Sequence, residues 1–208
     1  VLLHVWERVW SFLKKAGTIL FLCCMVMWFL ATFGVENGAF GMVEDMEASF
    51  LAIIGTFLAP IFAPLGFGSW QAVASSLSGF VAKEGIVSTM GVLANMAEAT
   101  ESDAALWQYV MTDFFHGSAL AGFTFLTFNL LDSPCLAAIS TMAKEMGNKS
   151  WTAFAVIFQN VFAYAVCLMI YQLGSFAMGG GFGIGTASAV IVLAVTLSYS
   201  FTSSLSSE

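Results

Sequence analysis

Apolar residues are gathered into six long stretches, separated by short segments that carry most of the charged side chains. The stretches cover about residues 16–34, 50–66, 70–95, 118–142, 151–174 and 184–201. A helix needs about 20 apolar residues to cross a bilayer, and none of the stretches alternates as a membrane β-strand does. Because only helices and closed barrels satisfy the backbone in lipid, the pattern predicts an all-α, polytopic membrane domain with about six membrane-embedded helices.

Residues 1–15 follow a different pattern, with apolar and polar side chains on opposite faces of a helix. The apolar face carries Trp6, Val9, Trp10 and Leu13. The polar positions are Glu7, Arg8, Lys14 and Lys15. Such a helix lies in the plane of the membrane surface, where tryptophan is favoured. We therefore predict an amphipathic interfacial helix over residues 1–15 and a helical transmembrane domain over residues 16–208.

Composition agrees with a membrane domain and argues against several function classes. Of 208 residues, 59% are hydrophobic and only 9% are charged, whereas soluble domains carry about 25% charged residues. The net charge of −7 and the lack of a basic patch argue against nucleic acid as a partner. The sequence lacks the phosphate-loop, dinucleotide-binding, zinc-protease and nucleophile-elbow motifs. We therefore expect neither an enzyme nor a permanently bound cofactor.

The positions of lysine and arginine predict the orientation of the chain in the membrane. Arg8, Lys14 and Lys15 precede the first stretch, and Lys144 and Lys149 lie between the fourth and the fifth. The loops at 35–49 and 96–117 contain acidic residues but no lysine or arginine. Because positively charged flanks stay on the cytoplasmic side, we predict a multi-pass protein in the lipid bilayer with both termini in the cytoplasm.

The fourth stretch places a carboxylate, a helix breaker and a thiol within four positions, at Asp132, Pro134 and Cys135. Proline removes a backbone donor and should free a carbonyl near residue 130. Carboxylate, carbonyl and thiolate groups are all metal ligands. On a continuous helix, the polar residues that share one face would be Asn129, Asp132, Ser133 and Ser140. This is a candidate metal site, and a proline kink beside a packing cysteine is the structural alternative.

Two other stretches also carry polar side chains into apolar surroundings, where such residues are functional candidates. In the fifth stretch a single helical stripe contains Asn160, Tyr164, Cys167 and Tyr171. The stripe should face protein or water rather than lipid, either as interhelical hydrogen bonds or as the lining of a path. The third stretch contains Lys83 and Glu84, and adjacent residues on a helix do not face each other. We therefore expect each of these two charges to have another partner.

Three segments, taken together and in this order, carry a family resemblance. They are ERVWSFLKKAGTILF, LAPIFAPLGFGSWQAVASSLSGFVAKEGIVSTMGVL and SPCLAAISTMAKEMGNKSWTAFAVIFQNVFAYAVCLMIYQLG. With their spacing they resemble the C-terminal membrane half of bacterial ferrous-iron transport protein B (FeoB), over about residues 6–174. The chain looks like the second of the family's two gate regions with its flanking helices, either as an excised fragment or as one subunit of a split system.

The resemblance implies a function and a set of partners. FeoB carries Fe²⁺ across the bacterial inner membrane, so Fe²⁺ would be the transported substrate here. Intact members also have a cytoplasmic GTP-binding domain and a first gate, both of which would lie outside this chain and act as its partners. GTP would bind only to that domain. Homo-oligomerisation is a further expectation that the sequence leaves open.

The family's gate motifs fall on the Pro134–Cys135 step and the Lys83–Glu84 step. The residues we predict to meet the metal are Cys135, Asp132, Glu84, Cys167 and Asn160. Structural or gating roles are predicted for Pro134, Lys83 and Ser133. Asp132 is a departure, because the family usually has an aromatic or small polar residue two positions before the proline. Two rival functions stay open, a gate-fold transporter for nucleosides or another solute and a non-conducting assembly module.

Overall fold

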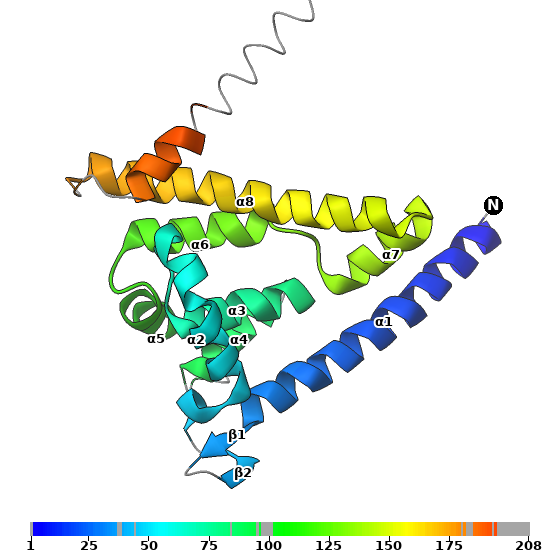
Figure 1. Cartoon of the computed structure of the whole chain (residues 1–208). Helices are drawn as coiled ribbons and strands as arrows, with labels where there is room; N and C mark the ends of the chain where they lie inside the picture. The colour runs from blue at the N-terminus through cyan, green and yellow to red at the C-terminus, as the bar shows by residue number, and fades with distance from the viewer. Residues whose placement is uncertain are drawn as a thin grey trace, which may run out of the picture.

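The computed structural model describes residues 2–36, 39–43, 45–83, 85–94, 96, 102–179, 181, 185–192 and 194. It is built almost entirely of helices, as Figure 1 shows, so the all-α prediction is confirmed apart from one small hairpin. The elements in the first half are α1 (Leu2–Thr32), β1 (Phe33–Glu36), β2 (Ala39–Met42), η1 (Met46–Ala48), α2 (Phe50–Phe62), η2 (Ala63–Leu65), α3 (Trp70–Val81) and α4 (Gly85–Leu93). The second half contains α5 (Ala104–Tyr109), the π-helical turn η3 (Val110–Phe114), α6 (Ala119–Leu131), α7 (Leu136–Met146) and α8 (Lys149–Ala177).

Helix α1 runs without a break through the predicted boundary between residues 15 and 16. In its first half the rings of Trp6 and Trp10 stack with centroids 6.2 Å apart, and the Lys14 ammonium lies 5.6 Å from the Trp10 centroid. The second half is apolar over Phe21–Thr32. The interfacial segment and the first apolar stretch therefore form one rod, and their assignment as separate domains stays a prediction.

The predicted loop at 35–49 contains most of a two-stranded antiparallel hairpin. Strands β1 and β2 pair from Phe33 opposite Met42 to Glu36 opposite Ala39. Gly34 lies so close to the backbone of Ala48 that a Cβ could not be accommodated. Each strand is only four residues long. The alternation of apolar and polar residues in so short a strand cannot be distinguished from the apolar stretches beside it.

Two helices are long and apolar enough to cross a membrane among the described residues, namely Ala119–Met146, which includes the break before α7, and Lys149–Ala177. A third crossing is available if Phe50–Leu65 and Trp70–Val81, which are bent by 97° relative to each other, form one broken span. The fourth and fifth predicted stretches are therefore confirmed as candidate spans. Half of the last stretch, 184–201, lies outside the described residues.

The third predicted stretch, residues 70–95, is not one helix. Helix α3 ends at Val81, Ala82 is extended with φ −151° and ψ 113°, and α4 begins at Gly85. The two helices pack against each other as a hairpin whose turn contains Lys83. The prediction of a single helix here was wrong, because the small residues of this stretch suit a tight helix pair as well as one long helix.

The core lies between α2, α3, α6 and α8. Its centre is a group of aromatic rings in which Phe67 makes edge contacts with Phe125 and packs on Phe62 and Phe128. The outward face of α8 is apolar and exposed, with a ladder of rings from Trp151 through residues 154 and 158 to Phe162. Aromatic side chains therefore serve both as packing inside the domain and as its exposed surface, which suits a body surrounded by lipid.

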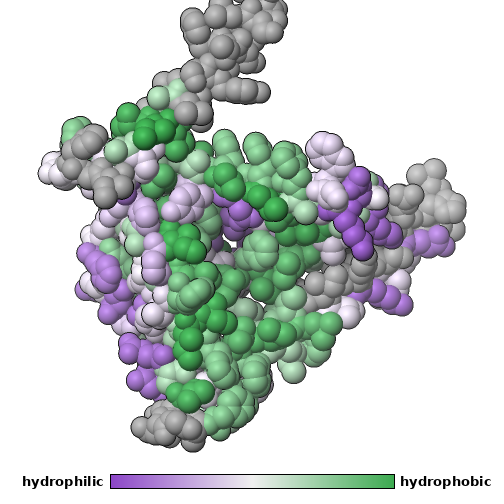
Figure 2. All heavy atoms as spheres, viewed as in Figure 1, coloured by the Kyte–Doolittle hydropathy of each residue, from purple (hydrophilic) through white to green (hydrophobic). Residues whose placement is uncertain are grey.

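Hydrophilic residues gather at two ends of the molecule, and an apolar band lies between them on the face that Figure 2 shows. One end holds the α7–α8 turn with Lys144 and Lys149, close to the beginning of α1 in Figure 1. At the other end, burial raises the pKa of Tyr109, and the carboxylates of Asp113 and Glu47 raise it further. The two acidic loops therefore approach each other at Tyr109, away from the lysine-bearing flanks.

Candidate functional site

The fourth stretch is divided into two helices by the segment Asp132–Cys135. Asp132 caps the end of α6 in an extended conformation (φ −62°, ψ 171°), and its N–H donates to the Phe128 carbonyl at 2.8 Å. Cys135 caps the start of α7 with φ −58° and ψ 158°. Pro134 explains the break, because it lacks an N–H and disfavours helical geometry in the residue before it. Ser140 lies on α7, so the single polar face predicted for a continuous helix does not form.

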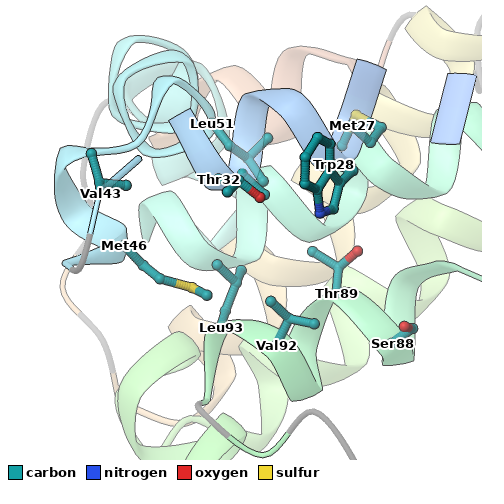
Figure 3. A pocket seen from close by; sticks show the side chains of 11 residues that line it. Met27, Trp28, Thr32, Val43, Met46, Leu51, Ser88, Thr89, Val92 and Leu93 are labelled. Atoms are coloured by element: carbon teal, nitrogen blue, oxygen red, sulfur yellow. The ribbon is translucent and has the colours of Figure 1, made fainter. Parts of the chain in front are cut away.

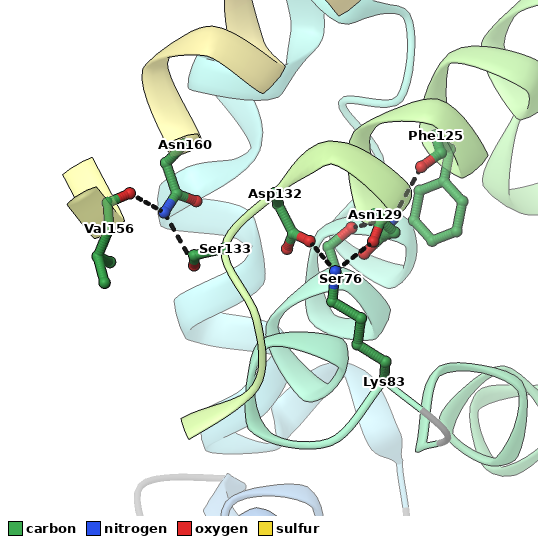
Figure 4. Close-up of polar contacts among 8 residues, drawn as sticks. All are labelled: Ser76, Lys83, Phe125, Asn129, Asp132, Ser133, Val156 and Asn160. Atoms are coloured by element: carbon green, nitrogen blue, oxygen red, sulfur yellow. Dashed lines mark hydrogen bonds and ion pairs between the residues drawn. The ribbon is translucent and has the colours of Figure 1, made fainter. Parts of the chain in front are cut away.

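The break in α6–α7 meets the turn of the α3–α4 hairpin through one lysine. The Lys83 Nζ donates to Oδ1 of Asp132 at 2.6 Å and to the carbonyl of Asn129 at 2.8 Å (Figure 4). Only 4% of the Asp132 side chain is exposed, compared with 35% of Lys83. The predicted free carbonyl near residue 130 is thus the carbonyl of Asn129, and the predicted partner for Lys83 is found. Glu84 lies outside the described residues.

Asn129 extends this polar centre from α6 to the neighbouring face of α3. Its Nδ2 donates to Oγ of Ser76 at 3.1 Å and to the Phe125 carbonyl at 2.8 Å (Figure 4). Its Oδ1 is buried and has no hydrogen-bond partner among the described residues. A Cβ on Gly79 would lie 3.3 Å from that oxygen. The face of α3 that carries Ser76 and Gly79 is therefore turned towards α6.

Electrostatics explain why a lysine lies where these two helices end. The last carbonyls of α3 and α6 lack helical donors and carry partial negative charge. A cation near such helix ends is favourable, and the carboxylate of Asp132 adds a full negative charge at the same point. Because an unpaired charge in apolar surroundings is costly, Lys83 and Asp132 depend on each other for burial.

The stripe on α8 forms hydrogen bonds to several other elements. Asn160 Nδ2 donates to Ser133 Oγ at 3.0 Å (Figure 4), and Tyr164 Oη donates to the carbonyl of Ile61 at 2.8 Å. The thiol of Cys167 is fully buried and donates to the carbonyl of Thr124 at 3.6 Å. The stripe faces protein, as the sequence pattern predicted.

The predicted metal-binding residues occupy separate places in the structure. Asp132 and Cys135 lie in the same break, Asn160 reaches it through Ser133, and Cys167 contacts a different part of α6. Among the described residues, no group of three or more His, Cys, Asp or Glu side chains is arranged to hold a metal ion. The ligand assignments of Asp132, Cys135, Asn160 and Cys167 remain predictions.

The pairing of Lys83 with Asp132 was not foreseen from the sequence. A signal was present, because two opposite charges in apolar stretches of one domain are each other's expected partners. The residues are 49 positions apart, and a helical reading of both stretches gave no reason to bring them together. Only the two helix breaks, which were not foreseen as a pair, place them side by side.

A cavity of about 440 Å³ lies apart from this centre, between α1, α2 and α4 (Figure 3). Apolar side chains form most of its wall, including those of Met27, Met46 and Leu93. Hydroxyl groups of Thr32, Ser88 and Thr89 and the ring of Trp28 complete the lining. Its volume falls in the range of about 300–1,000 Å³ that is usual for small-molecule sites.

Comparisons with known proteins match most of the chain. The family model named Gate and described as nucleoside recognition matches residues 13–149. Fe(2+) transporter FeoB of Staphylococcus aureus (strain MSSA476) is 36% identical over 169 residues, covering 81% of this chain and 24% of that protein. FeoB of Methanocaldococcus jannaschii is 32% identical, covering 84% of this chain and 25% of that protein. FeoB of Campylobacter jejuni is 32% identical, covering 79% and 28%, respectively.

The chain spans about a quarter of the length of these FeoB relatives. No solved structure matches it. The similarity therefore covers a membrane region within longer transporters.

Proposed function

Because this chain belongs to the Gate family and is similar to a membrane region of Fe(2+) transporter FeoB, we propose that it forms part of the path by which ferrous iron crosses the membrane. The observation that carries the proposal is the meeting of two broken helices at a buried polar centre. Transporters commonly bind ions where helices are discontinuous, because the interrupted backbone supplies free carbonyls and helix ends.

In this proposal the segment Asp132–Cys135 is the place where the ion meets the protein. The thiol of Cys135, at the start of α7, would supply a soft ligand that favours a transition metal over Mg²⁺ or Ca²⁺. Asp132 and the Asn129 carbonyl would supply oxygen ligands. Pro134 holds the break open, and Ser133 is fixed from α8 by Asn160. Glu84 and Cys167 rank behind these residues, and Lys83 controls access to the carboxylate.

The setting of this function is also part of the proposal. We infer a multi-pass protein of the bacterial inner membrane with both termini in the cytoplasm. The two lysine-bearing flanks at one end of the molecule and the acidic loops at the other support this orientation. A GTP-binding domain and a first gate of the same transporter would be its partners, so any GTP chemistry would lie outside this chain. A homo-oligomer is compatible with the exposed apolar faces of α1 and α8.

Replacement of one cysteine tests the proposed path. In the full-length transporter, Cys135→Ser should lower Fe²⁺ uptake into cells or vesicles at least about tenfold, the scale on which loss of a group at a metal site acts. The matched control is Cys24→Ser, because Cys24 is an exposed thiol on α1. Uptake is measured with radioactive iron and normalised to the amount of protein in the membrane. Unchanged uptake by Cys135→Ser would contradict the thiol's role.

A nucleoside or a related solute is the second candidate substrate, and the description of the matched family favours it. Tyr164 and Asn160 on α8 could stack on or donate to such a solute, but they already donate to Ile61 and Ser133. The cavity with Trp28, Ser88 and Thr89 is the better-placed receptor (Figure 3). Uptake of labelled nucleosides by the full-length protein, with Trp28→Ala abolishing it, would support this candidate over iron.

A further inference from the structure

We propose that the Lys83 ammonium is a tethered cation that occupies the divalent-cation site of this domain, and that the transported ion enters by displacing it. The inference rests on the proposed function and adds a device that neither the family nor the relatives' names assign. The site consists of two oxygens at the end of α6, namely one from the Asp132 carboxylate and the backbone carbonyl oxygen of Asn129. The Lys83 ammonium, which we call the plug, comes from a different part of the chain, the α3–α4 turn (Figure 4).

The geometry at Nζ is that of a cation held by oxygens. Two oxygens of different chemical kind, a carboxylate and a backbone carbonyl, lie 2.6 and 2.8 Å from the same nitrogen. Divalent ions with oxygen ligands lie at about 2.0–2.6 Å from them. An ion that replaced the ammonium would therefore need these oxygens to close in by only a few tenths of an ångström. The ammonium and the ion cannot occupy this point together, so they compete for it.

Asn129 also carries a second oxygen, in its side-chain amide. Oδ1 of Asn129 is buried with no hydrogen-bond partner among the described residues, whereas Nδ2 of the same amide donates twice. A buried acceptor without a donor is costly and is rarely retained without a reason. A cation with several ligands would satisfy this oxygen, which the single ammonium does not bind in this structure.

The Lys83 ammonium can move towards solvent, whereas the Asp132 carboxylate is buried. The side chain of Lys83 is 35% exposed, while that of Asp132 is 4% exposed. Four methylene groups and a turn between two short helices let the ammonium move by rotation of its own side chain. Asp132 is thus shielded as long as Lys83 is in place and becomes reachable once Lys83 has turned away. The exchange replaces the single charge of the ammonium with the double charge of the ion, so the centre with its one Asp132 carboxylate changes from neutral to a net charge of +1.

Chemical reactivity of the lysine tests the exchange in the unmodified protein. Full-length transporter in detergent is treated with a small amine-acetylating reagent, with and without Mn²⁺ as an air-stable probe, and acetylation is read by mass spectrometry. Mn²⁺ should raise acetylation of Lys83 severalfold, while Lys144 and Lys149, which are exposed, should not change. If the acetylation of Lys83 is the same with and without Mn²⁺, the proposal is wrong.

Substitution of the plug provides an independent measurement. Lys83→Met keeps the length of the side chain and removes the charge, so Mn²⁺ binding, followed by electron paramagnetic resonance, should tighten. If the lysine closes the site nine-tenths of the time, affinity rises about tenfold when it is removed. Adding Asp132→Asn to Lys83→Met should abolish the gain, and Lys144→Met is the matched control for the change in net charge. Equal affinity of folded Lys83→Met and wild type would overturn the proposal.

The outcomes separate this inference from the proposed function. A transporter that takes up Fe²⁺ but shows neither the reactivity change nor the tighter binding would retain the proposed function and lose the tethered cation. A protein that takes up no Fe²⁺ yet exposes Lys83 on addition of Mn²⁺ would keep the cation site and lose the iron path.

Discussion

The polar centre at the two helix breaks and the polar stripe on α8 place similar side chains in similar apolar surroundings, but they satisfy them differently. At the breaks, the charged Lys83 ammonium pairs with the Asp132 carboxylate. It also donates to the Asn129 carbonyl at the end of α6. On α8, neutral groups bond to their neighbours while the helix continues for 29 residues. Burial of the polar groups at the breaks therefore depends on one ion-pair partner, whereas burial of those on α8 depends on several weaker hydrogen bonds.

This difference separates residues that stabilise the fold from residues that we propose to bind the transported ion. Asn160 illustrates the first group, because its amide donates both to Ser133 and to the Val156 carbonyl one turn earlier on its own helix. The centre at the breaks leaves one acceptor of Asn129 without a partner among the described residues, and the lysine of its charge pair is 35% exposed. Neutral hydrogen bonds between membrane helices stabilise by about 0.6 kcal/mol on average, whereas loss of one partner from a buried charge pair costs several kcal/mol.

The largest effect is expected from the charge pair. Lys83→Met should lower the free energy of unfolding of the full-length protein by about 3 kcal/mol, because it leaves the buried carboxylate of Asp132 without a counter-charge. Unfolding in detergent, followed by circular dichroism with rising temperature or denaturant, measures the loss. The matched control is Lys144→Met in the last turn of α7, where the side chain is exposed, and this substitution should change stability little.

A double substitution sharpens this result. Asp132→Asn in the Lys83→Met background removes the uncompensated charge, so it should restore part of the lost stability. If the two substitutions add without coupling, the pair is not the source of the stability, and the contrast with α8 disappears.

Asn129 should have the next largest effect, because it links α6 to α3 without a charge. Asn129→Leu keeps the size of the side chain and removes both donated bonds, to Ser76 and to the Phe125 carbonyl. Loss of these bonds should cost about 1.5 kcal/mol, and removal of the unpaired Oδ1 offsets part of the loss. The free energies of unfolding of Asn129→Leu and Lys83→Met are measured under the same conditions. A larger loss for Asn129→Leu would contradict this ranking.

The sequence predicted the helical class, the two clearest spans and the inward face of α8, because each depends on a local period of apolar residues. Pro134 likewise predicted a free carbonyl near residue 130, which is that of Asn129. The tight α3–α4 hairpin and the β1–β2 hairpin were missed, since short elements rich in small residues leave no period to read. The pairing of Lys83 with Asp132 was missed because it is a tertiary contact that depends on two separate breaks.

Substitution of Cys167 tests whether the α8 stripe belongs to the proposed Fe²⁺ path. It is fully buried against the Thr124 carbonyl, so Cys167→Ala should cost about 1 kcal/mol through the small cavity that it leaves. If the stripe serves packing alone, Fe²⁺ uptake per folded molecule should equal that of wild type. Uptake that falls as far as in Cys135→Ser would instead place the Cys167 thiol among the residues that the ion meets.

The smallest effect is expected from a single hydroxyl on α8. Tyr164→Phe removes only the bond from the tyrosine hydroxyl to the Ile61 carbonyl, near the end of α2, and should cost about 0.6 kcal/mol. The ring stays in place, so differential scanning calorimetry should show a slightly lower melting temperature with uptake unchanged. Tyr171→Phe is a matched control on the same stripe. A loss for Tyr164→Phe as large as that for Lys83→Met would show that α8 depends on single partners as the helix breaks do, because Ile61 lies in the last turn of α2, where the carbonyls lack helical donors.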